Sequence, residues 1–209
     1  MKPGTYVQHR ETGAIGMVQV KWCINCRAWS DVIMSGGAEH GVQPDDWLPI
    51  PYLDAIDWTD HAAFTAECLR TWRAPLAGTE KGRDYLRLGA IGELGEAASI
   101  VAKVLRDGTP VDDALKLRFA KEVGDCLWFK AVMAHEVNEL YGAGMDRQGA
   151  VLERSGSALW DMLVSVRTEA YCIDIGDNPA DSAYCRRLVI AKLRDRAVRG
   201  KIGGSGDDR

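Results

Sequence analysis

The chain has 209 residues, of which 46% are hydrophobic and 27% are charged, and its formal net charge at pH 7 is −4. This composition is ordinary for a folded protein, and the length allows one large domain or a medium domain with a small appendage. The acidic balance gives no reason to expect nucleic-acid affinity, and no apolar run approaches the ~20 residues that span a membrane. The first residues also lack the apolar core of a signal peptide, so we expect a cytoplasmic protein.

Residues 1–55 are predicted to form a small β domain. Strand-forming residues gather at 5–9 and 15–22, and glycine-containing turns separate the strand candidates. Short strands joined by such turns favour an SH3-like β-barrel, which Pro49 and Pro51 end. A barrel of this size has little core of its own. We therefore expect it to serve in structure or in contact with a partner.

Cys23 and Cys26 lie in this segment at the spacing of half a zinc site or of a redox pair. A zinc site would need two more ligands, and the sequence has no second Cys-x-x-Cys. No βαβ pattern supports a thioredoxin-like role. Two ordinary thiols are the favoured interpretation, and metal binding by this pair stays open.

The remaining residues, 56–209, are predicted to form an α-helical domain, because apolar residues recur at helical spacing between glycine- and proline-rich breaks. The expected helices cover about 60–72, 81–106, 111–140, 150–173 and 180–198. The core side of the second is expected to include Tyr85, Leu88, Ile91, Leu94, Ala98, Val101 and Leu105. That of the third is expected to include Leu115, Phe119, Val123, Leu127 and Val132. The predicted fold is therefore mainly α, an antiparallel helical bundle after the small barrel, with a basic, glycine-rich tail.

Two pairs of acids interrupt the apolar helices. Glu93 and Glu96 form the first pair, and Glu122 and Asp125 form the second, directly before the apolar run 126–129. The members of each pair stand three residues apart, so they point the same way on a helix. Carboxylates in apolar stretches are costly to desolvate unless positive charge meets them. Four facing acids would form an oxygen-rich site that suits Mg²⁺ or Mn²⁺.

A solvated helix face and a di-iron site are weaker interpretations of these acids. Acids at this spacing are common on solvated helix faces, but two pairs on neighbouring apolar helices favour a metal site. A di-iron bundle would use Glu-x-x-His motifs, and none of the four histidines stands three residues after a glutamate. An all-oxygen site is therefore favoured over iron.

The residues around these acids resemble a known family. The segments 88–97 and 121–128, with Lys103 between them, are similar to the MazG-like nucleoside triphosphate pyrophosphohydrolases. The signature of that family is a Glu-x-x-Glu followed, some dozens of residues later, by a Glu-x-x-Asp. The chain end, 192–209, resembles the C-terminal motif of a phage and bacterial branch. Some members carry a further Glu where this chain has Gly92.

The resemblance implies an all-α enzyme that uses Mg²⁺ to hydrolyse nucleoside triphosphates to monophosphate and pyrophosphate. It implies Glu93, Glu96, Glu122 and Asp125 as metal ligands and catalytic residues, with Mn²⁺ as a possible substitute ion. It also implies a homodimer or a homotetramer. The base, the sugar, the number of metal ions and the acid that serves as base stay open.

Cations that bind phosphate are expected in two places. Lys103 and Arg106 follow Glu96 along the same helix. A basic stretch near the chain end contains Lys192, Arg196, Arg199, Lys201 and Arg209. The alternative is an exposed lysine and a solvated last helix whose cations suit its dipole. Trp72, Tyr85 and Trp128 are candidates for base recognition, with core packing as the alternative.

Two rival functions differ in class from the enzyme. The first is a non-catalytic regulator that binds nucleotide and whose β domain contacts a protein or nucleic acid. It would bind nucleotide without releasing pyrophosphate. The second is a structural helical oligomer, in which neutralising the acids would stabilise the fold because buried like charges would be relieved.

Overall fold

The computed structural model describes residues 6–9, 15–21, 29–34, 37–39, 47–49, 55–72, 75–175 and 182–198. The chain divides into two compact units, Met1–Asp57 with Arg187–Arg209, and Trp58–Arg186. The first boundary lies two residues beyond the predicted limit of the β domain. The second falls inside the last helix, so the C-terminal residues group with the β segment, whereas we expected them in the helical domain.

The first unit contains one antiparallel sheet. Its strands are β1 (Tyr6–His9), β2 (Ile15–Lys21), β3 (Trp29–Met34), β4 (Gly37–Glu39) and β5 (Trp47–Pro49), in the order β4-β3-β2-β1-β5. Val7 of β1 is fully buried, and it pairs with Gly16 on one side and Pro49 on the other. No pairing among these described strands joins β4 to β5. Closure into an SH3-like barrel is therefore not shown and stays a prediction.

The described residues are mainly helical, as predicted. The helices are α2 (His61–Leu69), α3 (Glu80–Asp107), α4 (Asp113–Ala143), α5 (Arg147–Cys172) and α6 (Ser182–Val198). Four of them begin at a side chain that accepts a hydrogen bond from a first-turn backbone N–H, which satisfies a group that the helix itself leaves unpaired. These N-caps are Asp60, Thr79, Asp112 and Asp146. None of the helices described is both long and apolar enough to cross a bilayer.

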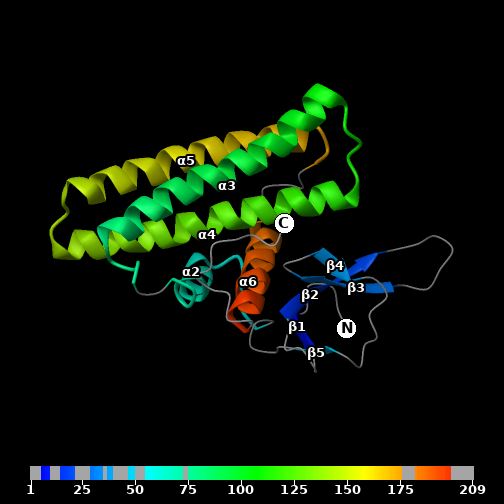
Figure 1. Cartoon of the computed structure of the whole chain (residues 1–209), viewed down its shortest axis with the longest axis horizontal. Helices are drawn as coiled ribbons and strands as arrows, with labels where there is room; N and C mark the ends of the chain where they lie inside the picture. The colour runs from blue at the N-terminus through cyan, green and yellow to red at the C-terminus, as the bar shows by residue number, and fades with distance from the viewer. Residues whose placement is uncertain are drawn as a thin grey trace. The chain divides into compact units, whose positions relative to one another are not determined.

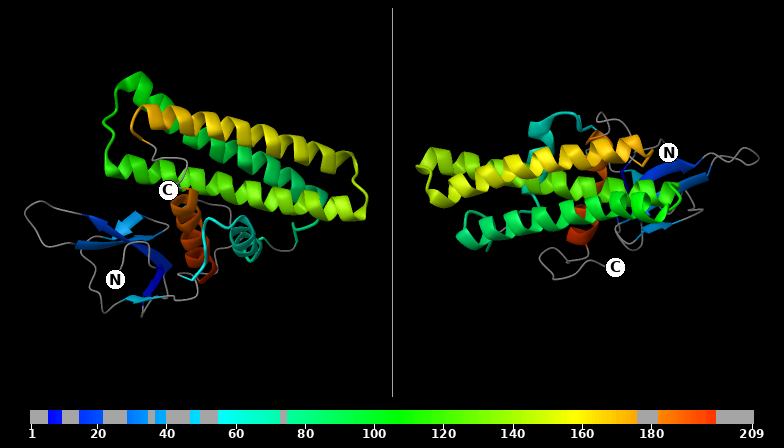
Figure 2. Two further views of the ribbon diagram at one scale, coloured as in Figure 1. Left: turned by 180° about the vertical axis from the view of Figure 1, so that it is seen from behind. Right: turned by 90° about the horizontal axis from the view of Figure 1, so that it is seen from above.

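Three long helices, α3, α4 and α5, form the body of the second unit. They run side by side along most of their length, each antiparallel to the next in sequence (Figure 1), and the other views agree (Figure 2). Short links at 108–112 and 144–146 require this arrangement. Gly108 ends α3 with a φ of 63°, a conformation that glycine adopts without steric cost. The shorter α2 packs on α4.

The core side of α4 was predicted correctly, but that of α3 was partly wrong. All five residues expected in the core of α4 are buried. On α3, Leu88, Ile91 and Leu105 are more than half exposed, and Tyr85 is 47% exposed. The side of α3 that faces α4 and α5 instead includes the small residues Ala90 and Ala97. Apolar residues surround most of α3, so periodicity could not select the buried side, and close helix packing selected the small ones. The buried residues of this helix are Gly82, Leu86, Ala90, Leu94, Ala97, Ile100 and Val101.

Candidate metal centre

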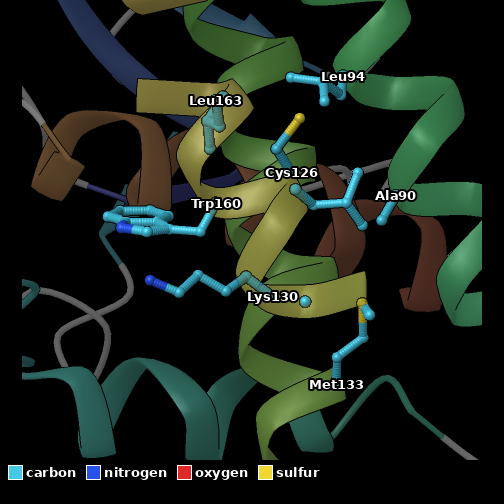
Figure 3. Close-up of a pocket in the computed structure, with 9 residues that line it drawn as sticks. Ala90, Leu94, Cys126, Lys130, Met133, Trp160 and Leu163 are labelled. Carbon is cyan, nitrogen blue, oxygen red and sulfur yellow. The ribbon is translucent and has the colours of Figure 1, made fainter. Parts of the chain in front are cut away.

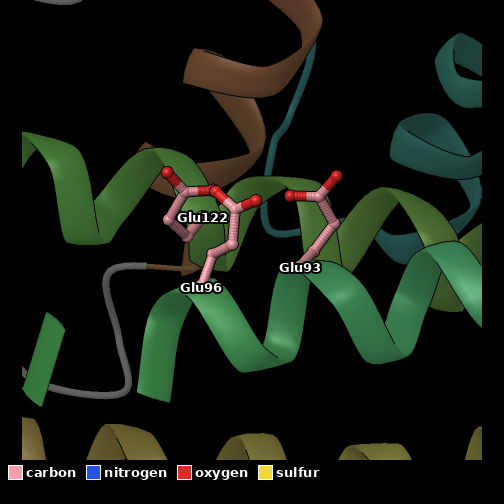
Figure 4. Close-up of side chains that lie close together, drawn as sticks. All are labelled: Glu93, Glu96 and Glu122. Atoms are coloured by element: carbon pink, nitrogen blue, oxygen red, sulfur yellow. The ribbon is translucent and has the colours of Figure 1, made fainter. Parts of the chain in front are cut away.

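Three of the four predicted acids come together between α3 and α4. Glu93, Glu96 and Glu122 each offer a carboxylate oxygen, and these oxygens all lie within 4.8 Å of one another. Figure 4 shows the two α3 side chains and the α4 side chain converging on one region. Glu93 and Glu122 are half-buried and Glu96 is exposed, so the group opens to solvent on one side.

The donor set fits a hard divalent cation. Mg²⁺ prefers carboxylate and water oxygens at about 2.1 Å, so two oxygens on one ion are at most about 4.2 Å apart. Small side-chain rotations would bring the three glutamates from their present spacing onto one ion. Three carboxylates also supply the negative charge that offsets the dehydration of such an ion. The unfilled positions would be left for water or for substrate oxygens.

A close contact between the two helices positions the acids. A Cβ atom at Gly89 would lie 2.4 Å from Cζ of Phe129, so only glycine allows this ring to rest against α3. Gly89 is one helical turn before Glu93, and Phe129 is two turns after Glu122. The contact therefore sets the separation of α3 and α4 beside the acids.

Asp125 does not join the three glutamates. It is 8% exposed and lies one turn after Glu122 on α4, but it is outside the group of described residues whose oxygens share the 4.8 Å limit. Its side chain is one methylene shorter than that of glutamate, which reduces its reach toward α3. The sequence motif places Asp125 beside Glu122, and of these two acids only Glu122 belongs to the group of three glutamates.

The acids nevertheless act together on one neighbour. Burial raises the pKa of the Cys126 thiol far above its usual range, and the negative charges of Asp125, Glu93 and Glu122 raise it further. Both effects disfavour the thiolate, which is the nucleophilic form of cysteine. The carboxylate oxygens are therefore the favoured ligand atoms in this region.

The cavity behind Cys126 is too small for a nucleotide base. It lies among α3, α4 and α5, and its volume of about 20 Å³ is enough for one water molecule. Figure 3 shows its lining, in which Lys130 reaches to the Trp160 ring. The Lys130 ammonium lies 3.0 Å from the ring centroid, and burial lowers its pKa. A base would have to bind elsewhere.

The aromatic candidates for base recognition form one cluster. Trp72 stacks on Tyr85 with ring centroids 6.1 Å apart, and it meets Trp128 edge-on at 6.2 Å. Both tryptophans are 8% exposed, whereas Tyr85 is half-exposed. Phe129 extends the cluster toward Gly89. Tyr85 lies about 12 Å before Glu93 along α3, so the cluster borders the acids and only its tyrosine is open to a ligand.

The structure also reveals a buried acid that was not predicted from the sequence. Glu136 on α4 is 5% exposed and accepts hydrogen bonds from the Trp72 indole N–H at 2.6 Å and from the Gly78 backbone N–H at 3.0 Å. Its charge close behind the apolar residues 131–134 and directly before Val137 was a usable signal. The hydrogen bond from its indole N–H holds Trp72 of the aromatic cluster in place.

The structure describes only some of the predicted phosphate-binding cations. Lys103 is exposed and lies about 10 Å beyond Glu96 along α3. Arg106 forms a two-point ion pair with its neighbour Asp107 at 2.6 Å, on an exposed surface. Lys192 and Arg196 belong to the part of α6 in the other unit. Arg199, Lys201 and Arg209 lie outside the described residues, as do Cys23 and Cys26.

No protein-family model, curated protein or solved structure matches this chain. The family resemblance therefore depends on the acid motifs with their surroundings and on the chain end, 192–209.

Proposed function

We propose that this protein is a Mg²⁺-dependent nucleoside triphosphate pyrophosphohydrolase of the MazG-like type. The single observation that supports it most is the convergence of Glu93, Glu96 and Glu122, from two separate sequence motifs, to within 4.8 Å. A Glu-x-x-Glu and a Glu-x-x-Asp on facing antiparallel helices are what the resemblance requires. Burial and the neighbouring acids disfavour the Cys126 thiolate, so this cysteine is a poor candidate for a nucleophile.

The chain's own residues would divide the work as follows. The three glutamates hold the metal, and Asp125 adds negative charge from the buried side. Bound Mg²⁺ supplies neutralisation of the phosphates and lowers the pKa of a water molecule. One of these carboxylates would accept the proton of the attacking water. Tyr85 offers an open aromatic face for the base, and Lys103 a cation for the phosphates.

Cations from elsewhere in the chain would complete phosphate binding. Arg106 would have to exchange its partner Asp107 for a phosphate oxygen. Lys192, Arg196, Lys201 and Arg209 keep this role as a proposal from the resemblance. The same resemblance proposes a homodimer or homotetramer, and the exposed Leu88, Ile91 and Leu105 of α3 supply an apolar face that a second copy would cover. Light scattering behind size exclusion measures that assembly.

The test is release of pyrophosphate from a panel of ribo- and deoxyribonucleoside triphosphates. The wild type is assayed with Mg²⁺, with Mn²⁺ and with EDTA, and Glu122→Gln is assayed with Mg²⁺. Glu139→Gln is the matched control, because Glu139 is an exposed acid on the same helix. We expect metal-dependent formation of pyrophosphate and monophosphate, lost in Glu122→Gln by at least about a hundredfold and unchanged in the control.

The alternative is a regulator that binds nucleotide without hydrolysing it, with the five-stranded sheet as its contact to a protein or nucleic acid. It predicts Mg²⁺-dependent nucleotide binding in a folded protein with no turnover on any member of the panel. That outcome would reject the enzyme.

A further inference from the structure

A polar pocket lies between the N-terminal turns of α3 and of α5. Its volume is about 320 Å³, at the lower end of the range of small-molecule sites. The residues that line it are Arg83, Asp84, Arg87, Arg147, Gln148, Val151 and Leu152. Neither the acid motifs nor the proposed reaction uses any of them.

The lining of this arginine pocket is cationic. Three arginines and one aspartate give it a net charge of +2. Asp84 pairs with Arg87 at 2.9 Å, whereas Arg147 has no ion pair within the described part of the chain. Two more carboxylates border the pocket and are otherwise engaged. Glu80 accepts a hydrogen bond from Gln148, and Asp146 caps α5.

Arg83 is a largely buried cation with little compensation. Its side chain is 12% exposed, and its closest carboxylate is Asp146 at 3.9 Å. Its terminal nitrogens donate to Gln148 Oε1 at 2.8 Å and to the Gly78 backbone carbonyl at 3.5 Å, which hold the guanidinium in place, while its Nε is buried without a hydrogen-bond partner. Buried charge of this kind is costly unless an opposite charge meets it.

The arginines also stand where the helices disfavour cations. The N-terminal end of a helix carries partial positive charge, and a cation there is unfavourable. α5 begins with Arg147 and has no acid in its first turn. Arg83 and Arg87 lie in the first two turns of α3. Glu80 in the first turn of α3 and the N-cap Asp146 of α5 offset part of this repulsion, and an anion in the pocket would offset more of it.

We propose that the arginine pocket binds a small anion that carries two or more phosphate groups. Guanidinium groups match phosphate oxygens in pairs, and three guanidinium groups around one pocket can engage more than one phosphate group. The pocket lies between α3 and α5, whereas the three glutamates lie between α3 and α4. It is therefore separate from the candidate metal centre, and the proposal does not depend on the proposed reaction.

The test is calorimetric titration of the full chain with inorganic pyrophosphate in EDTA, which removes metal from the acid group. The variants are Arg87→Gln, Arg147→Gln and the double variant, in which exposed or half-exposed side chains change and Arg83 is left to support the fold. Arg118→Gln is the control, because Arg118 is an exposed arginine of α4 outside the pocket. Far-UV circular dichroism checks the fold of each.

We expect wild type and Arg118→Gln to bind one pyrophosphate equally, and each pocket variant to bind it about tenfold more weakly. Glu122→Gln should bind as wild type does. Citrate, a polycarboxylate, should compete weakly, and equal competition would overturn the preference for phosphate. Absence of binding to the wild type, or unchanged affinity in the double variant, would overturn the proposal that the arginine pocket binds an anion.

Discussion

Two glutamates of α4 show how the same residue type takes different roles on one helix. Glu122 and Glu136 are fourteen residues apart, nearly four turns, so they face nearly the same direction. Glu136 meets N–H donors of Trp72 and Gly78. Glu122 meets two further carboxylates, those of Glu93 and Glu96.

The partners decide what each carboxylate does. Neutral donors satisfy the charge of Glu136, so this acid holds α4 to the segment around Trp72 and stabilises the fold. Facing carboxylates repel Glu122, so this acid would gain from a bound cation. The difference predicts opposite responses to substitution at the two ends of the helix.

The largest loss of stability is expected for Glu136→Ala. The substitution leaves the buried Trp72 indole N–H and the Gly78 N–H without their acceptor, and we expect the free energy of unfolding to fall by about 3 kcal/mol. Urea denaturation followed by tryptophan fluorescence measures it. Glu136→Gln keeps an acceptor oxygen and should lose much less. Equal losses in the two variants would show that the hydrogen bonds are not what Glu136 contributes.

A smaller loss of stability is expected for Gly89→Ala. Gly89 of α3 contacts Phe129, which lies midway between the two glutamates on α4. The added methyl group would overlap the Phe129 ring and separate α3 from α4, at a cost of about 2 kcal/mol. The same denaturation measures it, and Mg²⁺ affinity should also fall because the acids move apart. Wild-type stability would mean that the ring moves aside and that the contact does not position the acids.

Glu122→Gln is expected to change the free energy of unfolding in opposite directions with and without metal. In EDTA it removes repulsion among three carboxylates, so the free energy of unfolding should rise by about 1 kcal/mol. In Mg²⁺ the wild type gains stability from the bound ion and the variant does not, so the order should reverse. Parallel thermal melts in the two buffers test this. A variant that is more stable in both would favour the purely structural oligomer.

The smallest effect is expected for Gly95→Ala, between the first two acids. A Cβ there would have nothing within 4 Å, so the substitution should stabilise α3 by about 0.5 kcal/mol through helix propensity. Denaturation in EDTA measures the gain. A loss instead would indicate that another molecule, such as a second copy of the chain, packs closely on this side of α3.

Local features of this protein were readable from its sequence. Two of the long helices, α3 and α4, end at glycine, and four helices begin at capping side chains, because those signals act over a few residues. The spacing of Glu93 and Glu96 guarantees that they share a helix face for the same reason. The mainly helical fold and the core side of α4 followed from periodicity.

Contacts between distant segments decided the rest. The sequence could not show that Ala90 and Ala97 would lie on the buried side of α3 while Leu88 and Ile91 are exposed. Nor could it show that Glu136 would meet Trp72, 64 residues earlier in the chain. It paired Asp125 with Glu122, but side-chain reach across the α3–α4 contact left Asp125 outside the group of three. The arginine pocket joins residues more than 60 positions apart. Hydrogen bonds within a helix are determined by neighbours along the chain, whereas convergence of side chains depends on how whole helices pack.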